Sequence, residues 1–218
     1  MKFLFLDTST SSGVVGLFSD ETLIQKRQFV AAFTNSKLLM PTVYEMVSEP
    51  KTLQAVAVGI GPGSYTGIRV AVATAKGISF ALRVPLVGVS SLKGFIPELP
   101  HDGRFIAAID AKSGGIYAVE GQRSGEKVTF FSDEKLMSVE EFRAAQFQAT
   151  CIVTPIGGAE AIRNRLPEVT AHIFEREPAV EFLGKLAFQA LQRKEGVMDG
   201  NLPLLYLRKT QAEIEKDL

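Results

Sequence analysis

The chain has 218 residues, with 24 basic and 24 acidic side chains and one cysteine, Cys151. A chain of this length forms one large domain or two small ones, and its balanced charge provides no net field that would concentrate nucleic acid. A single cysteine excludes an internal disulfide and fits a reducing compartment. Since the first apolar run ends at Asp7 and the later run 68–89 contains three cations, we expect no export signal, no membrane span and a cytoplasmic location.

Three short β-rich segments open the chain, at residues 2–7, 12–19 and 23–30. A hydroxyl-rich turn, 8–11, separates the first two. Turns of this composition between short runs of β-branched and aromatic residues favour strands that pair with their sequence neighbours. The first thirty residues therefore predict an antiparallel meander.

A helix is expected next. Thr34 can cap its N-terminus, and apolar residues recur at helical spacing to about Ser48. Pro41 lies inside this segment. Because proline has no amide hydrogen and crowds the carbonyl four residues earlier, we expect a kink or two short helices here.

The next elements indicate a parallel sheet. An apolar strand, 54–60, leads into a glycine-rich loop, a helix from about 66 to 82, and a second apolar strand, 85–89. A helix that joins two short buried strands is typical of a parallel crossover.

The second half begins like the first, with a strand, 104–110, that ends in Asp110 as the opening strand ends in Asp7. The remaining expected elements are strands at 116–120 and 151–156 and helices near 138–147, 158–166 and 178–195. The repetition suggests a duplicated α/β unit. We expect two domains, 1–102 and 103–218.

The loop and helix start GIGPGSYTGIRV, at 59–70, is the sharpest feature of the sequence. Glycines between a strand and a helix let backbone amides approach an anion, which makes Gly61, Gly63 and Ser64 candidate contacts. The lysine of a triphosphate loop is absent, and a dinucleotide loop requires glycine at position 64. Two interpretations remain, an anion site and a turn that lets the helix pack tightly.

The hairpin after the first strand is a second candidate. Asp7 could lie near a hydrated cation, and Thr8 and Ser9 near a phosphate. A plain turn has the same composition, since Asp, Ser and Thr all favour turns. With the glycine loop, these residues form a candidate degenerate nucleotide site.

Other catalytic chemistry is not indicated. His101 and His172 are the only histidines and have no metal-ligand spacing. Ser64 has proline where a nucleophile elbow requires glycine two positions earlier. Cys151 lies in an apolar strand, which favours a buried, inert thiol. We therefore predict no catalytic residue and no metal ligand.

The helix 66–82 is rich in small residues, and its small and apolar positions cover more of its circumference than one core-facing stripe requires. Part of it could face a helix of another chain. The alternative is a helix enclosed within its own domain.

Five segments occur in a characteristic order: DTST at 7–10, GIGPGSYTGIRV at 59–70, GVSSL at 88–92, DAKSGGIYAV at 110–119 and YLR at 206–208. Together they resemble the bacterial TsaB family, also called YeaZ. The resemblance implies an α/β fold of the actin and Hsp70 ATPase type (ASKHA), with two ribonuclease-H-like halves.

The resemblance also implies a function. TsaB-like chains are non-catalytic scaffold and activator subunits in the synthesis of N6-threonylcarbamoyladenosine at position 37 of tRNA. They bind the catalytic subunit TsaD and, with it, the ATPase TsaE, so that tRNA is contacted only through the complex. No cofactor is expected on the isolated chain, and ATP or ADP belongs to the assembled complex. The metal-binding histidines of the catalytic relative have no counterpart in 33–41.

The family pairs with TsaD, or with itself as a homodimer, through helices of the N-terminal half, and one patch can serve both pairings. The matching helices here are 34–48 and 66–82. The interface candidates on them are Leu38, Met46, Gly67, Ile68, Ala71, Val72, Ala75 and Ser79. Two other functions remain open, a metallopeptidase and an ATP-binding protein of the same fold that acts alone.

Overall fold

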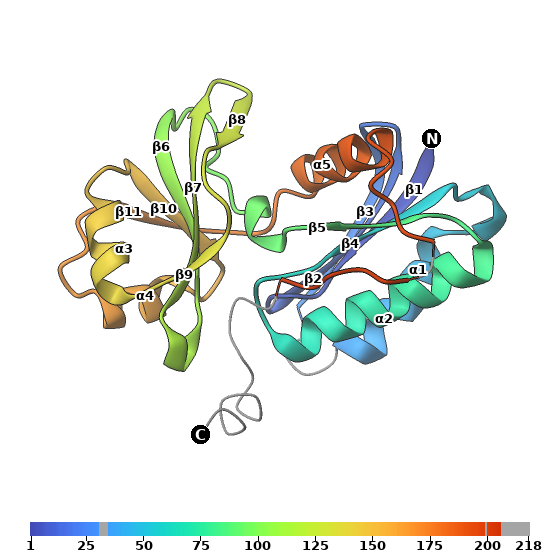
Figure 1. Cartoon of the computed structure of the whole chain (residues 1–218), viewed down its shortest axis with the longest axis horizontal. Coiled ribbons are helices and arrows are strands. Elements are labelled where there is room, and N and C mark those ends of the chain that lie inside the picture. The colour runs from blue at the N-terminus through green and yellow to red at the C-terminus, as the bar shows by residue number, and fades with distance from the viewer. Residues whose placement is uncertain (31–34, 199, 206–218) are drawn as a thin grey trace. The chain divides into compact units, whose positions relative to one another are not determined.

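The computed structural model describes residues 1–30, 35–198 and 200–205 and divides the chain into two units. Unit 1 comprises Met1–Gly94 and Pro178–Leu204, and unit 2 contains Phe95–Glu177. No described helix is long and apolar enough to cross a membrane. Figure 1 shows both units.

Unit 1 is built on a five-stranded sheet with the order β3-β2-β1-β4-β5. Its strands are β1 (Lys2–Asp7), β2 (Ser12–Ser19), β3 (Thr22–Val30), β4 (Ala55–Gly59) and β5 (Leu86–Val89). The first three pair antiparallel, whereas β4 is parallel to both β1 and β5. The expected meander and parallel crossover are both confirmed.

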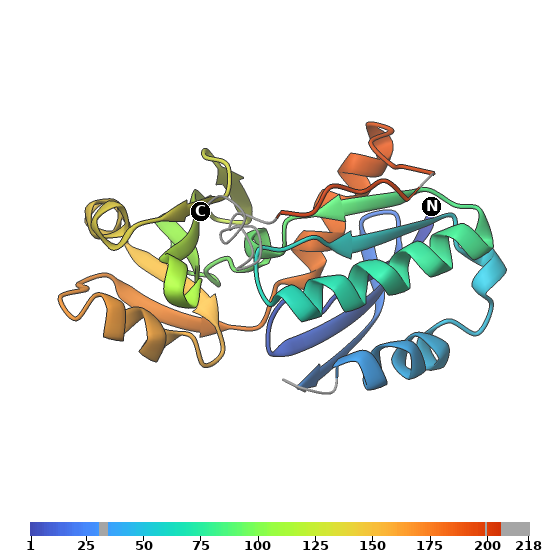
Figure 2. The same cartoon turned by 60° about the horizontal axis from the view of Figure 1, so that its bottom comes forward.

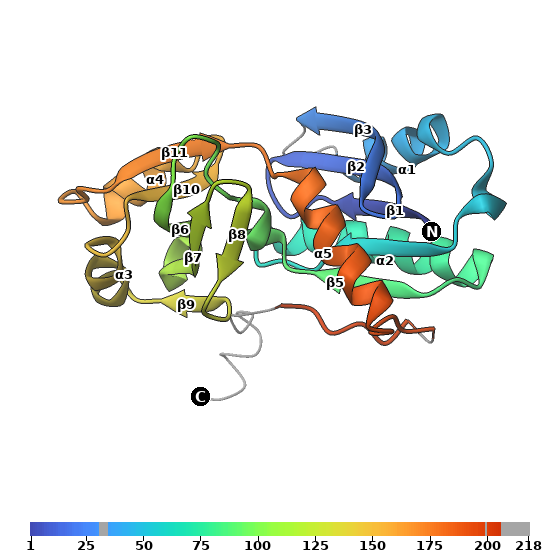
Figure 3. The same cartoon turned by 90° about the horizontal axis from the view of Figure 1, so that it is seen from above.

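Helices cover both faces of this sheet (Figures 1 and 3). The side chains of Leu4 and Leu6 share a buried cluster with residues of α1 (Asn35–Met46) and α2 (Tyr65–Leu82). Figure 2 shows these two helices along one face of the sheet. Those of Phe3 and Phe5 point to the opposite face and pack against α5 (Val180–Gln192). Side chains alternate along a strand, so these two sets lie on opposite faces of the sheet. Both sets are apolar because helices cover both faces. Full burial of each such side chain stabilises the fold by roughly 1.5–3 kcal/mol.

The position of α5 differs from the expected division at residue 102, which assigned this helix to the second domain. Its apolar face packs on the sheet of unit 1, and Gly184 is so close to the ring of Phe18 that a Cβ there would collide with it. The amide of Ala179 donates to the carbonyl of Gly94 at the point where the chain re-enters unit 1 (2.8 Å). Helical periodicity reveals an apolar face but not the sheet that the face covers.

On the other face of the sheet, α1 and α2 can be compared with the helices expected from the sequence. α1 continues through Pro41 as one helix, so the expectation of two short helices is wrong. The expected cap, Thr34, lies outside the described residues. α2 begins after Ser64, whose hydroxyl accepts from the amide of Gly67 (3.3 Å). Short 3-10 helices occur at Pro50–Thr52, Ser91–Gly94 and Lys112–Gly114.

Unit 2 contains a six-stranded sheet with the order β11-β10-β6-β7-β8, with β9 paired to β7. Its strands are β6 (Gly103–Asp110), β7 (Ile116–Ser124), β8 (Lys127–Phe130), β9 (Lys135–Met137), β10 (Cys151–Pro155) and β11 (His172–Arg176). α3 (Val139–Gln146) and α4 (Ala159–Arg165) pack on one face through residues such as Phe142 and Ile162.

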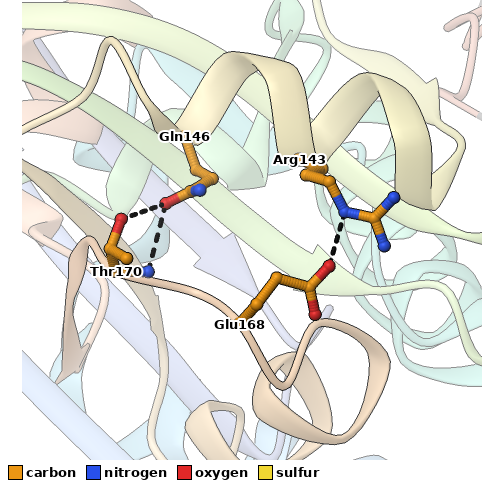
Figure 4. Close-up of polar contacts among 4 residues, drawn as sticks. All are labelled: Arg143, Gln146, Glu168 and Thr170. Atoms are coloured by element: carbon orange, nitrogen blue, oxygen red, sulfur yellow. Dashed lines mark hydrogen bonds and ion pairs between the residues drawn. The ribbon is translucent and has the colours of Figure 1, made fainter.

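Side-chain contacts join α3 to the loop that leads into β11 (Figure 4). The side-chain carbonyl of Gln146 accepts from the amide and the hydroxyl of Thr170 and from the amide of Ala171, over 3.2–3.3 Å. Arg143, one helical turn before Gln146 in α3, donates to Glu168 in the same loop. These contacts fix the end of α3 and the start of β11 relative to each other.

Candidate functional site

The hairpin after β1 and the loop after β4 meet in unit 1 around Asp7. Its side chain is only 4% exposed. A Cβ on Gly59 would collide with the carboxylate of Asp7 and lie 2.7 Å from the hydroxyl oxygen of Ser91. The absence of a side chain at Gly59 therefore makes room for the carboxylate inside the fold.

Hydrogen bonds to Asp7 offset only part of the cost of burying its charge. The amide of Ser9 donates to Oδ1 of Asp7 (2.7 Å). Burial raises the pKa of Asp7, and hydrogen bonds from Ser9 and Ser91 lower it by less. The carboxylate is therefore held inside the unit rather than presented to a hydrated cation in solvent.

Backbone donors of the glycine loop are engaged by the chain itself. The amide of Ser64 donates to the carbonyl of Ser9 (2.6 Å), and the amide of Gly61 donates to the hydroxyl of Ser91 (3.1 Å). The amide of Gly67 is bound by the Ser64 cap, as described above. These three amides are the hydrogen-bond donors that an anion at the start of α2 would need.

The glycines themselves allow the hairpin and the loop to touch. A Cβ on Gly63 would collide with the carbonyl of Ser9, and one on Gly67 with the carbonyl of Thr8. The hydroxyl of Thr8 in turn donates to the carbonyl of Gly67 (2.6 Å). Of the two interpretations of this loop, these contacts favour the turn that permits tight packing.

Asp110, the counterpart of Asp7 in unit 2, has a different environment. Nε of Arg165 donates to Oδ1 of Asp110, and the amide of Lys112 donates to the same oxygen (3.0 Å). The guanidinium is thus a permanent counter-charge for this carboxylate. The two aspartates occupy equivalent positions in the sequence but not equivalent electrostatic environments.

The interface candidates require correction. Seven of the eight are buried and belong to the interior of unit 1, so they do not form an exposed surface: Met46, Gly67, Ile68, Ala71, Val72, Ala75 and Ser79. Only Leu38 is exposed, at 38%. The small residues of α2 allow this helix to approach its own sheet closely. Of the two interpretations of this helix, the structure therefore favours the one in which it is enclosed within its own domain.

The outward faces of α1 and α2 carry other residues, which the sequence reasoning missed. Tyr44 is 75% exposed and Phe80 is 84% exposed. Leu38, Met40 and Tyr65 are also exposed, and we call the exposed large apolar residues of these two helices together the outer α1–α2 surface. Helical spacing could have found it, because residues 65, 69, 73, 77 and 80 lie opposite the buried stripe.

The described residues contain no group of three or more His, Cys, Asp or Glu side chains placed to hold a metal ion. Cys151 is buried in β10, as expected, and burial raises the pKa of its thiol. A protonated thiol is a poor nucleophile.

Comparison with known proteins places the chain in a class and then in a group. The family model of the tRNA N6-adenosine threonylcarbamoyltransferase TsaD matches residues 30–187. YeaZ from Pseudomonas aeruginosa superposes with a TM-score of 0.77 at 25% identity, over 93% of this chain and 98% of that one. A second solved structure, described as an uncharacterized protein with similarity to peptidase YeaZ from the same organism, gives 0.76 at 25% identity, over 95% and 99%. The two units thus form an α/β protein of the actin-like class.

The sequence relatives are more specific. TsaB of Escherichia coli is 31% identical over 130 residues, 56% of either chain. TsaB of Bacillus subtilis is 32% identical over 122 residues, 54% of this chain and 53% of that one. These matches span about half the length of the curated relatives. The chain belongs to the TsaD family of proteins, within its TsaB (YeaZ) group.

Proposed function

We propose that the chain is a non-catalytic subunit in the synthesis of threonylcarbamoyladenosine in tRNA. In this proposal it binds a catalytic relative of the TsaD type and, with it, the ATPase TsaE, and it contacts tRNA only through the complex. The matched relatives are named tRNA threonylcarbamoyladenosine biosynthesis protein TsaB, and the matched family model is named for the transferase. The proposed location is cytoplasmic.

The observation that carries the partner-binding role is the outer α1–α2 surface. The inner sides of both helices are already occupied by the sheet, so the exposed aromatic rings of Tyr44 and Phe80 do not serve the core of unit 1. Large exposed apolar side chains on the outward sides of neighbouring helices are a feature of protein–protein contacts. At Gly77, on the same side of α2 as Phe80, a Cβ would meet no atom within 4 Å, which leaves space for a close neighbour.

A surface of this kind suits a partner with a related fold. Two related units can pair about a two-fold axis through equivalent helices, and the same patch can then serve a second copy of the chain when the relative is absent. We therefore assign both the heterodimer and the homodimer to the outer α1–α2 surface.

The site around Asp7 supports the non-catalytic part of the proposal. Its carboxylate is buried, and the amides of Gly61 and Ser64 are bound within the chain. ATP or ADP is therefore assigned to the assembled complex, with no cofactor on this chain alone. Titration of the isolated chain with ATP and Mg²⁺ tests the rival function, an ATP-binding protein that acts alone, which requires saturable binding.

Reconstitution tests the proposal as a whole. We expect tRNA modification when this chain, the TsaD-type subunit, TsaE and substrates are combined, and none when either this chain or its TsaD-type partner is omitted. Phe80→Asp places a charge on the outer α1–α2 surface and should abolish pairing and modification together. Phe147→Asp is the matched control, because Phe147 is an exposed phenylalanine of unit 2 (67%). Modification by this chain alone, or full activity of Phe80→Asp, contradicts the proposal.

A further inference from the structure

An open cavity of about 320 Å³ lies in unit 2 and is lined by His101, Asp102, Thr150, Cys151, His172 and Phe174. It brings together both histidines of the chain, which are far apart in the sequence. Its volume is at the lower end of the range of small-molecule sites, about 300–1,000 Å³. The hairpin and glycine loop described above belong to unit 1 and contribute nothing to it.

The strand register explains why these residues meet. β10 and β11 pair in parallel, with Cys151 beside His172 and Val153 beside Phe174. His172 and Phe174 are two positions apart and so share one face of the sheet, whereas Ile173 points to the opposite face, under α3 and α4. The face that carries the two rings is thus the one not occupied by these helices.

His101 reaches the same face from the segment before β6. Its amide donates to the carbonyl of Glu98 (3.0 Å), which fixes the turn that carries the imidazole. The ring centroids of His101 and Phe174 lie 4.6 Å apart, and those of His172 and Phe174 lie 4.3 Å apart. Rings at these distances are in direct contact, so three planar side chains form one aromatic cluster beside the cavity.

Besides the two imidazoles, which can each donate and accept, the oxygen-bearing side chains of the cavity present acceptors. The amide of Gly125 donates to Oδ1 of Asp102 (2.9 Å), which orients the carboxylate. The hydroxyl of Thr150 donates to the carbonyl of Arg104 (2.8 Å), so its oxygen presents lone pairs to any ligand. Asp102 opposes an anionic ligand by charge repulsion. A neutral planar group that carries N–H donors matches this arrangement.

We propose that this cavity binds a purine base with an exocyclic amino group, adenine or guanine, stacked on the ring cluster of Phe174, His101 and His172. The amino group donates to Asp102. Unpaired bases are commonly bound by stacking on phenylalanine and histidine side chains together with hydrogen bonds to their polar edges. The base could come from a free nucleoside or from single-stranded RNA. An RNA source would be a direct contact of this chain with RNA, in addition to the contact through the complex in the proposed function. Base binding by the cavity does not depend on that function.

Binding is tested with the riboside of 2-aminopurine, whose fluorescence is quenched when it stacks. The chain has no tryptophan to interfere. We expect saturable quenching that adenosine reverses and uridine, which lacks the amino group, does not. Phe174→Leu should weaken binding roughly fivefold or more, since stacking on one aromatic side chain accounts for at least that factor. Phe147→Leu, an exposed phenylalanine elsewhere in unit 2, should leave binding unchanged.

A second measurement avoids any variant that fails to fold. The two histidines give two Cε1-proton signals in the NMR spectrum of the unaltered chain, assigned through His101→Gln and His172→Gln. Adenosine should shift both signals with one common dissociation constant, and Asp102→Asn should weaken its binding. Unshifted signals at millimolar adenosine, unchanged binding by Phe174→Leu, or equal affinity for uridine would each overturn the proposal.

The source of the base is resolved with a short single-stranded oligoribonucleotide that contains one 2-aminopurine. If RNA supplies the base, this strand binds at least as tightly as the free riboside and competes with adenosine. If a free nucleoside is the ligand, adenosine binds and the strand does not compete. Phe80→Asp separates this proposal from the partner-binding role, because it should prevent pairing and leave adenosine binding intact.

Discussion

Replacing Asp7 by asparagine should make the protein more stable at neutral pH. In the folded chain, burial raises the pKa of Asp7 above its unfolded value, which is about 3.9. Ionisation of this carboxyl therefore costs stability. Its favourable contribution is fully present below the unfolded pKa and is lost as the pH rises through the folded pKa.

The size of the effect follows from linkage. Between the two pKa values the folded chain binds more protons than the unfolded chain, so the free energy of unfolding falls with pH by about 1.4 kcal/mol for each pKa unit of difference. Asparagine keeps an oxygen that can accept from the amide of Ser9, which now donates to Asp7. It fits the space left by Gly59 and carries no charge. A gain of 1 kcal/mol corresponds to roughly 2–4 °C in Tm for a chain of this size.

The assay is urea unfolding of both proteins at a series of pH values from 4 to 8. We expect the two curves to converge near pH 4 and the asparagine variant to be the more stable at pH 7. Asp133→Asn, at an exposed carboxylate, is the control and should follow the unaltered chain. A variant that loses stability at pH 7 would show that the ionised carboxylate is stabilised in the fold, and the reasoning would fail.

Two further predictions concern packing. Gly67→Ala places a Cβ against the carbonyl of Thr8 and should lower the free energy of unfolding by about 1–3 kcal/mol. Gly77→Ala, where a Cβ meets no atom within 4 Å, should raise the free energy of unfolding by up to about 1 kcal/mol. Thermal unfolding of the two variants measures both effects. Gln146→Leu removes the acceptor for the amide and hydroxyl of Thr170 and should lower the free energy of unfolding by about 1–3 kcal/mol. Amide hydrogen exchange should become faster only in the loop before β11. A uniform increase in exchange over unit 2 would show that Gln146 does not hold this loop.

Much of unit 1 could be predicted from local pattern. Strands 2–7 and 12–19 were predicted with the bounds they have, because short apolar runs between hydroxyl-rich turns specify strands directly. The crossover through α2 followed from the same kind of signal. In unit 2, β8, β9 and β11 were not predicted. They are only three to five residues long, which is too short for a period to be recognised along the chain.

Only part of the candidate site could be predicted from the sequence. The residue types of Asp7 and of the glycine loop suggested one candidate site, and the structure places them after the neighbouring strands β1 and β4. The sequence could not show that the amide of Ser64 bonds to the hairpin or that Ala71 and Ala75 face inward. Those outcomes depend on how closely α2 approaches the sheet, which is a property of two elements and not of either one.

The sequence by itself determined the strands of the first ninety residues, the helix between β4 and β5, the class of fold and the family, because these depend on local periodicity and on motifs read along the chain. Only the tertiary structure decided that α5 covers the sheet of unit 1, that the carboxylate of Asp7 is buried, and that His101 and His172 share one cavity. The physical reason is that burial and contact arise between segments distant in the chain, and no local pattern encodes which segments will meet.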